Sequence, residues 1–428
     1  MEKKCCAPDC EHCPFPDCNV EMTKQEKWAA HQREYRRKHP GVDTPYHRRW
    51  IENHYEQYRQ QQNKSQRRRY RDSFEVREKI KEKNRRYYQA HKEQMKAKMS
   101  LSEILEKTKG SLIISDAFTK ADSVLNHKGY KNIACSVSGG ADSDILIDIC
   151  EKVKPHGVHY VWFDTGIEYQ ATKEHLKYLE EHYGITIERE RAVRPVPVSN
   201  KMYGQPFLSK YASKMIYRLQ KHNFDWKDEP YEVAIQKYPN CKCALKWFNN
   251  LYGDKRFSYS RFNISGQKYL REFLIAHPPT FNISDKCCSG AKKDVSKKYI
   301  KDNHIDLMII GVRRSEGGTR AGLKTCFQPT SHFKAALYRP IFWFTNADRK
   351  EYEELFNIKH SRCYTEYGFK RTGCACCPYG KDFDDELKVL EQHEPNLCKA
   401  VKNIFHDSYE YTRQYRAFRK EMEEKRGT

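Results

Sequence analysis

Ile133-Ala-Cys-Ser-Val-Ser-Gly-Gly-Ala-Asp-Ser-Asp144 joins the signals of a strand, a turn and a helix within twelve residues. The apolar run Ile133–Val137 is typical of a short buried strand. The next three residues, Ser138, Gly139 and Gly140, predict a turn in which the missing Cβ atoms let backbone N–H groups approach a ligand closely. The stretch therefore predicts a strand that ends in an open, donor-rich loop.

Asp142 and Ser143 follow this loop and begin a helix that apolar spacing predicts over 142–153. The junction would direct several N–H donors and the positive end of a helix dipole to one point, which suits a phosphate. The loop is neither a Walker A motif nor a dinucleotide fingerprint, because both need other spacings. The alternative reading is an ordinary capped turn.

The chain from Leu101 onward alternates apolar strands with amphipathic helices, whereas the residues before it do not. This alternation predicts an α/β fold with a doubly wound, mostly parallel sheet, whose ligands bind at the carboxyl ends of the strands. We expect strands at 132–137, 158–163, 185–190 and 307–312, and helices at 142–153, 168–183 and 346–357. We expect the core domain over 101–380 with an insertion at 200–300, and a helical segment at 381–428.

Two further loops follow predicted strands. Asp164, Thr165 and Gly166 end the second strand, where an acid can contact a ribose or adenine or act through Mg²⁺, unless the pair only caps a helix. The fourth strand leads into a glycine-rich loop whose arginine forks suit the phosphate or sulfate of a nucleotide. This loop contains Gly311, Arg313, Glu316 and Arg320.

The 17 cysteines of the chain fall into separate groups. Cys287 and Cys288 are adjacent, and Cys374 and Cys377 stand in Cys-x-x-Cys spacing; such thiolates suit either an Fe–S cluster or tetrahedral zinc. The N-terminal residues 1–22 hold another group, in which Cys10 and Cys13 form the strongest pair. Zinc would supply the folding free energy that this knuckle lacks. Its expected ligands are Cys6, Cys10, Cys13 and Cys18, with Cys5 as an alternative to Cys6.

The segment 23–100 is a basic arm with almost no aliphatic residues. Between Lys24 and Lys98 it carries 23 lysines and arginines against 10 acids, within a chain whose formal net charge is +22. Such a surplus favours a nucleic-acid partner over a merely solvated helix face. No apolar run approaches the about 20 residues of a membrane helix, and the first residues lack a secretory signal, so we expect a cytoplasmic protein without a membrane partner.

The three loops and the cysteine pairs together resemble the PP-loop superfamily, and within it the phosphoadenosine phosphosulfate (PAPS) reductase family. Ser138–Ser143 is similar to its Ser-Gly-Gly-x-Asp-Ser loop, Asp164–Gly166 to its Asp-Thr-Gly, and the loop from Gly311 to Arg320 to its Gly-x-Arg-x-x-Glu-x-x-x-Arg pattern. The matching residues run from about 131 to 380. The resemblance implies that Asp142, Ser143, Arg313 and Glu316 act in catalysis, and that the three loops bind the nucleotide.

The cluster-bearing members of that family implicate Cys287, Cys288, Cys374 and Cys377 in a [4Fe–4S] cluster, with Cys376 as the main competitor. Proteins of DNA phosphorothioation systems combine such a cluster with a PP loop. The resemblance thus implies ATP, or APS or PAPS, as the substrate nucleotide, Mg²⁺ as a companion ion, and adenylation or sulfur transfer, with nucleic acid as a partner. A sulfur-donor or reductant protein is also expected.

Two departures separate this chain from true PAPS reductases. The nucleophilic cysteine of their Glu-Cys-Gly-x-His motif is missing, which leaves Cys326 and Cys398 as unsupported candidates. In addition, the Ser-Gly-Gly-x-Asp-Ser loop is nearer to that of ATP-cleaving members than to that of true PAPS reductases. Many of those ATP-cleaving members have lysine where this chain has Ala141. The alternatives are a thiol-dependent reductase that releases sulfite, a nucleotide-regulated nucleic-acid-binding protein without turnover, and a tRNA thiolase.

Overall fold

The computed structural model describes residues 99–253, 260, 262–318, 320–329, 335–425 and 427. Nearly all of the unit His91–Thr428 is thereby covered. The expected zinc knuckle at 1–22 and almost all of the basic arm at 23–100 lie outside the described residues. Within the described part, no helix is both long and apolar enough to cross a bilayer.

A six-stranded sheet forms the centre of this unit, in the order β3-β2-β1-β4-β6-β5. All neighbouring strands are parallel except β5, which runs antiparallel to β6. The α/β class and the mostly parallel sheet are therefore confirmed. The strands are β1 Ile133–Val137, β2 His159–Asp164, β3 Ile187–Arg191, β4 Leu307–Ile310, β5 Phe327–Gln328 and β6 Ala336–Tyr338.

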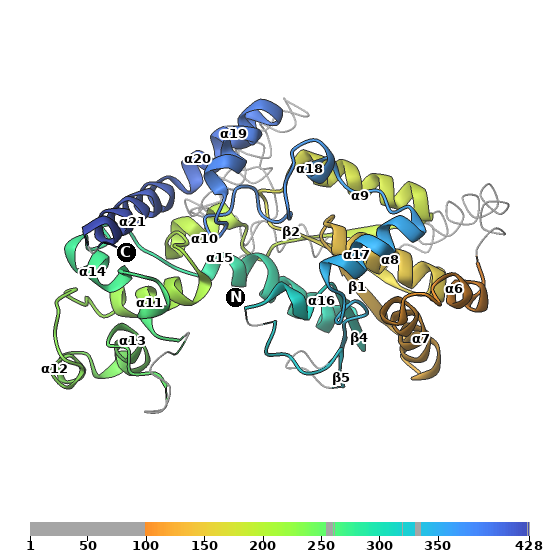
Figure 1. Cartoon of the computed structure of the whole chain (residues 1–428), viewed down its shortest axis with the longest axis horizontal. Coiled ribbons are helices and arrows are strands. Elements are labelled where there is room, and N and C mark those ends of the chain that lie inside the picture. Colours follow the sequence, from red (N-terminus) through yellow and green to blue (C-terminus); the bar gives the residue numbers. More distant parts are fainter. Residues whose placement is uncertain are drawn as a thin grey trace, which may run out of the picture. The chain divides into compact units, whose positions relative to one another are not determined.

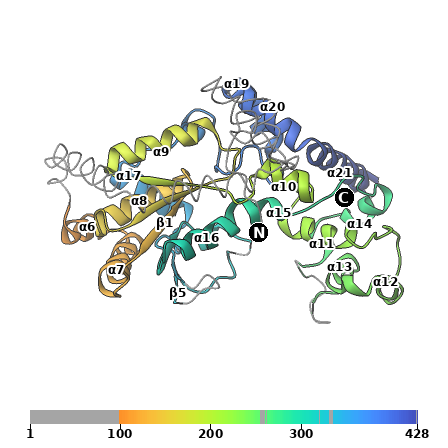
Figure 2. The same cartoon turned by 180° about the vertical axis from the view of Figure 1, so that it is seen from behind.

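The central strand β1 is buried on both faces, which explains its continuous apolar sequence. Its alternate residues Ile133, Cys135 and Val137 belong to a core with the helices of one face, while Ala134 packs with Tyr299 on the other. The helices of the first face lie along the sheet in both views (Figures 1 and 2), and α16 covers the opposite face. The helices of the first face are α6 Leu101–Lys107, α7 Leu112–His127, α8 Ala141–Val153, α9 Gln170–Tyr183 and α17 Asn346–Phe356. The helix of the opposite face is α16 Asp294–Asp302.

The expected strands and helices of this layer are all present, with small shifts at their ends. The helix expected from residue 168 begins at Gln170, because Glu168 accepts hydrogen bonds from Thr165 in the preceding turn. Strand β4 ends at Ile310, two residues before the expected Val312. The strands β5 and β6 were not expected, since two or three residues are too few to display a period.

The segment between β3 and β4 builds a second hydrophobic core around Phe207, Trp247 and Phe273, which the C-terminal helix α21 closes with Tyr411 and Tyr415. Figure 1 shows α11, α13 and α14 grouped beside α21. The elements of this core are α11 Lys210–Gln220, α12 Tyr231–Lys237, η2 Pro239–Cys241, α13 Lys242–Phe248, η3 Ile264–Gly266, α14 Leu270–Ala276 and α21 His406–Lys425. Helix α10 Val196–Tyr203 precedes them and places Val196 in a different core, which also contains buried cysteines.

A third core contains buried cysteines and aromatic residues from segments far apart in the sequence. Cys287, Cys363, Cys376 and Phe383 all belong to it. A π-helical turn, η4, follows the cysteine pair, and such turns are frequent at functional sites. The elements of this region are α15 Lys286–Cys288, η4 Ser289–Lys293, η5 Arg314–Glu316, α18 Arg362–Thr365, α19 Phe383–His393 and α20 Pro395–Ile404.

Candidate active site

The loop after β1 depends on two glycines for different reasons. Gly139 has φ +65°, a left-handed conformation that side chains rarely adopt, and a Cβ there would lie 2.7 Å from Thr172 Cγ2. Gly140 has an ordinary φ of −102°, but a Cβ would lie 2.8 Å from Thr372 Oγ1. Both positions therefore exclude a side chain so that neighbouring groups can approach the backbone.

Side-chain hydroxyl groups accept hydrogen bonds from the backbone N–H groups of this loop. Ser143 Oγ accepts from Ser138 N at 3.2 Å and from Gly140 N at 3.1 Å, and donates to Gly140 O at 2.7 Å. The N–H of Ala141, the first residue of α8, donates to Tyr364 Oη at 3.1 Å. The loop thus presents the converging donors that an anionic group needs, at the N-terminus of a 13-residue helix.

Arg313 joins the loop after β4 to the start of α8. Its Nε donates to Asp142 Oδ1 at 3.0 Å and its Nη1 to Asn346 Oδ1 at 3.0 Å, while the residue is only 5% exposed. Burial raises the pKa of Asp142, and the guanidinium of Arg313 opposes that shift. Glu316 accepts the N–H of Arg313 at 3.2 Å and pairs with Arg320. The predicted residues of the two loops are therefore brought together.

The loop after β2 lies on the other side of β1. Asp164 accepts Gly166 N at 2.9 Å and Arg189 Nε at 2.9 Å, so its carboxylate is already partnered. Thr165 Oγ1 donates to Glu168 Oε1 at 2.7 Å, and burial raises the pKa of Glu168. Since β2 and β4 flank β1 on opposite sides, the strand order reverses here, and ligands of open α/β sheets bind at such a point.

The four cysteines expected to bind the cluster lie within electrostatic range of one another. Cys287 donates a hydrogen bond to Cys288, which raises the pKa of Cys287 and lowers that of Cys288. The Cys374 and Cys377 thiols also raise the pKa of Cys287. The charge of the Cys374 thiolate, followed by those of Glu168 and Cys288, raises the pKa of Lys292. Soft thiols from two distant segments thus meet beside a cation.

Cys376, the alternative ligand for the cluster, has different surroundings from the other four cysteines. Its backbone has φ +43°, its N–H donates to Tyr169 Oη at 2.9 Å, and its carbonyl accepts from Tyr409 Oη at 2.6 Å. The residue is fully buried in the third core. These contacts support Cys377 over Cys376 as a partner of Cys374, although the assignment stays a prediction.

The donor set fits a cluster or a structural metal, because four thiols, that of buried Cys287 and those of three half-buried cysteines, influence one another electrostatically. Among the described residues, however, no three or more Cys, His, Asp or Glu side chains are arranged in the geometry of a metal site. The fit therefore rests on the chemistry of the four thiols and on their proximity.

The two unsupported nucleophile candidates lie elsewhere. Cys398 is 2% exposed in α20, and its Sγ donates to Leu387 O at 3.5 Å. Cys326 precedes β5, the edge strand of the sheet, and its carbonyl accepts the N–H of Arg339. Neither contact involves the loop after β1.

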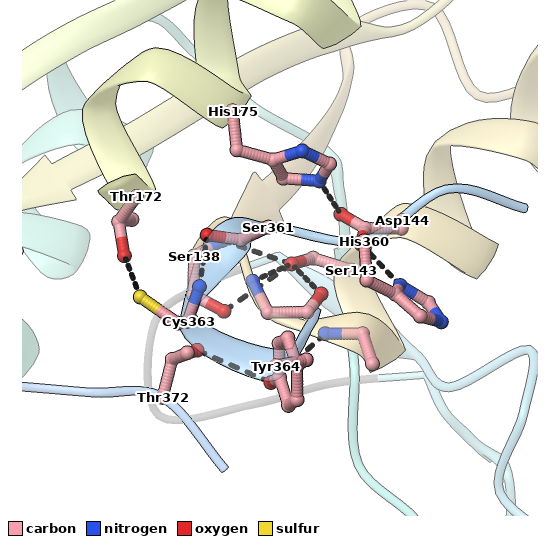
Figure 3. A network of polar contacts seen from close by, with 12 residues as sticks. Ser138, Ser143, Asp144, Thr172, His175, His360, Ser361, Cys363, Tyr364 and Thr372 are labelled. Carbon is pink, nitrogen blue, oxygen red and sulfur yellow. Dashed lines mark hydrogen bonds and ion pairs between the residues drawn. The ribbon is translucent and has the colours of Figure 1, made fainter. Parts of the chain in front are cut away.

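Sequence reasoning missed a polar network that holds the first turn of α8 (Figure 3). Fully buried Asp144 lies between two histidines, with His175 Nε2 at 3.0 Å and His360 Nδ1 at 2.8 Å. His360 also contacts Glu353 at 3.1 Å. Burial lowers the pKa of His360, but the two carboxylates outweigh it and raise that pKa to about 9. Isolated histidines without motif spacing gave no sequence signal.

The chain is similar in sequence or in structure to several known proteins. A protein of Methanocaldococcus jannaschii is 22% identical over 279 residues, which is 65% of this chain and 42% of that protein's length. Similar solved structures include the PAPS reductase of Candida auris, in a phosphate complex, at 12% identity and a TM-score of 0.34, covering 64% of this chain and 96% of that one. Another is the U34-tRNA thiolase of Methanococcus maripaludis with its [4Fe–4S] cluster, at 13% identity and a TM-score of 0.30, covering 72% and 79%.

The sequence pattern of the phosphoadenosine phosphosulfate reductase domain matches residues 132–245 and 261–379. These segments contain all three loops and both cysteine pairs described above. Because the match covers more than half of the 428 residues, this chain belongs to the phosphoadenosine phosphosulfate reductase domain family.

Proposed function

We propose that this protein binds ATP or another adenylyl nucleotide at Ser138–Ser143 and carries out adenylation or sulfur-transfer chemistry. The observation that carries the proposal is the convergence of N–H donors and Ser143 at the point where the strand order reverses, beside the buried guanidinium of Arg313. Such donors stabilise phosphate oxygens in a site of low dielectric constant.

For adenylation, a nucleophilic atom of the acceptor attacks the α-phosphorus of ATP, the bond from that phosphorus to the bridging oxygen breaks, and pyrophosphate leaves with the bonding electrons. Ala141 supplies no charge, and the guanidinium of Arg313 contacts the loop through Asp142 at 3.0 Å. Asp142 accepts a hydrogen bond from Nε of Arg313, and Glu316 accepts one from the backbone N–H of Arg313. Mg²⁺, when bound, would neutralise charge on the leaving phosphates.

We also propose that Cys287, Cys288, Cys374 and Cys377 hold a [4Fe–4S] cluster. Their support is the gathering of four thiols beside Lys292 and Lys210, whose charges favour thiolates. When bound, such a cluster supplies electron transfer or a site for sulfur. Within this chain, the hydrogen bond of 3.5 Å from Cys374 Sγ to Thr165 Oγ1 ties the cysteines to the loop after β2.

The test compares wild type with Asp142→Asn after anaerobic purification, and measures iron, acid-labile sulfide and zinc together with pyrophosphate release from ATP and Mg²⁺. Wild type is expected to contain about four iron and four sulfide per chain. Asp142→Asn is expected to lose pyrophosphate release by about a hundredfold or more, because Arg313 loses its anionic partner, and to keep its iron. The matched control is Asp116→Asn, whose carboxylate pairs with Lys120 on α7.

Unchanged pyrophosphate release in Asp142→Asn would remove this loop from the mechanism. Zinc alone in place of iron would overturn the cluster. The family match favours one second candidate, reduction of APS or PAPS to sulfite by a thiol donor. The same preparations are therefore assayed for sulfite, whose release without any pyrophosphate release would replace the adenylation proposal.

A further inference from the structure

Three hydroxyl groups, two of them from a distant part of the chain, surround the position that a Cβ of Gly140 would take. An ideal Cβ on this glycine would be 2.8 Å from Thr372 Oγ1, 3.2 Å from Tyr364 Oη and 3.4 Å from Ser138 Oγ. Tyr364 Oη and Thr372 Oγ1 also lie 3.3 Å apart, within hydrogen-bonding distance. Only Ser138 of these three belongs to the loop itself, so two side chains from the C-terminal part of the chain complete its surroundings.

Tyr364 occupies the acceptor position of a phosphate oxygen. Its Oη accepts the N–H of Ala141, one of the first N–H groups of α8, which have no acceptor within the helix. Burial raises the pKa of Tyr364, so its hydroxyl keeps its proton and can also donate. A bound phosphate oxygen could therefore replace Tyr364 at the Ala141 N–H and accept a hydrogen bond from the same hydroxyl.

The short helix α18 that carries Tyr364 is held in place by the residues immediately before the tyrosine (Figure 3). Ser361 Oγ donates to Ala171 O at 3.1 Å, and Cys363 Sγ lies 3.7 Å from Thr172 Oγ1. His360 contacts Asp144 in α8. Because α18 is fixed to both α8 and α9, the direction of Tyr364 toward the loop is built into the fold.

Resting on the nucleotide site proposed above, we propose that Tyr364 and Thr372 are positioning residues whose hydroxyls donate hydrogen bonds to a phosphate of the bound nucleotide. On binding, the phosphate oxygen takes over the Ala141 N–H, and the two hydroxyls turn from each other to the ligand. No bond other than hydrogen bonds forms or breaks. The preferred ligands are adenine nucleotides with a di- or triphosphate, and inorganic pyrophosphate.

The test measures dissociation constants of full-length wild type, Tyr364→Phe, Thr372→Val and Thr372→Ser for ATP, pyrophosphate and adenosine, by calorimetry. Loss of one hydrogen bond to a charged group weakens binding by about tenfold or more. We expect that loss for ATP and pyrophosphate in Tyr364→Phe and Thr372→Val, near wild-type affinity in Thr372→Ser, and unchanged adenosine binding throughout. A merely structural role would change the affinities for all three ligands together.

The matched control is Tyr367→Phe, since the Tyr367 hydroxyl donates to Glu394 at 3.0 Å instead of facing the loop. Ser143→Ala serves as a reference for the loop. If Ser143→Ala weakens ATP binding while Tyr364→Phe does not, or strengthens it by freeing the Ala141 N–H, this inference is overturned and the nucleotide site stands. If wild type binds neither ATP nor pyrophosphate, both proposals are overturned.

Discussion

Gly140 owes its identity to the approach of neighbouring groups, since its φ of −102° is open to any residue. Gly140→Ala would bring a methyl group within 2.8 Å of Thr372 Oγ1 and 3.2 Å of Tyr364 Oη. We expect these hydroxyls to move and ATP affinity to fall by about tenfold, the loss of at least one charged hydrogen bond. Equilibrium binding measures the affinity, and thermal unfolding checks that the protein remains folded.

Gly373→Ala is the matched control for this change, because a Cβ on Gly373 meets nothing within 4 Å. It lies beside Thr372 and next to Cys374, so it tests whether any added methyl group in this segment disturbs binding. Equal losses of ATP affinity in the two variants would contradict the assignment of Gly140 to the ligand's immediate surroundings.

The sequence predicted those site residues that lie within short continuous motifs. Ser138, Ser143 and Arg313 lie in short loops after apolar strands, so their meeting at one sheet edge follows from a parallel topology. Tyr364 and Thr372 lie more than 200 residues after the loop and carry no motif of their own. Their contribution depends on how α18 packs against α8 and α9, which local patterns do not encode.

At the scale of elements, the segment between α17 and α18 is attached to α8 by an ionic contact. His360 bridges Asp144 and Glu353, Glu353 also pairs with Arg349 at 3.0 Å, and the Tyr364 ring lies 5.7 Å from the His360 ring. Asp144 is fully buried, so its carboxylate depends on His175 and His360 to offset the loss of hydration. The contact therefore couples the stability of this region to pH.

His360 has a pKa of about 9 in the folded protein, against an ordinary value of 6.5. Because the folded-state pKa is the higher one, the stabilisation is fully present below pH 6.5 and is lost as the pH rises through about 9. We expect His360→Gln to lower the free energy of unfolding by about 2 kcal/mol at pH 6. That difference should shrink by pH 9.5, as measured by urea unfolding at both values.

His127→Gln is the control, because this histidine pairs with Asp122 while its side chain is 70% exposed. Its difference from wild type should be small at both pH values, since exposed pairs contribute little. A destabilisation of His360→Gln that stays constant from pH 6 to pH 9.5 would mean that the side chain acts by packing alone.

Helices and strands could be predicted where the periodic spacing of their apolar residues extends over enough positions to be recognised. Helix α8 repeats its apolar positions over 13 residues, whereas β5 has two residues and α18 has four. The latter elements depend on contacts with distant segments, as the hydrogen bond from Ser361 Oγ, at the start of α18, to Ala171 O in α9 illustrates. The candidate site includes residues on or near such short elements, which explains why the sequence alone did not predict Tyr364 and Thr372 as part of it.

At the scale of the whole molecule, four hydrophobic cores serve different segments of the described chain, two of them on the opposite faces of the sheet. The core on one face of the sheet supports the loop after β1, the core around Trp247 closes on α21, and the third core buries Cys287 and Cys376. Outside the described residues, the sequence carries 23 lysines and arginines between Lys24 and Lys98. We propose that this charge surplus serves a polyanionic partner.

We expect full-length protein to bind duplex DNA or tRNA with an affinity that falls steeply with salt, because each neutralised phosphate releases counterions. The cluster Arg67, Arg68, Arg69 and Arg71 is the densest group of arginines in the arm. Changing these four to Gln should reduce the slope of log affinity against log salt concentration by about three. Fluorescence anisotropy between about 50 and 200 mM salt measures that slope, with iron content and ATP binding as unchanged readouts.

The matched control replaces four exposed lysines of the C-terminal helices, Lys388, Lys399, Lys420 and Lys425, and so removes the same charge from the chain. If net charge alone attracted the nucleic acid, both quadruple variants would lose affinity equally. A selective loss in the arginine variant instead assigns binding to the arm. Stimulation of pyrophosphate release by DNA or by tRNA in wild type, lost in that variant, would then link the arm to the nucleotide site and identify the acceptor's class.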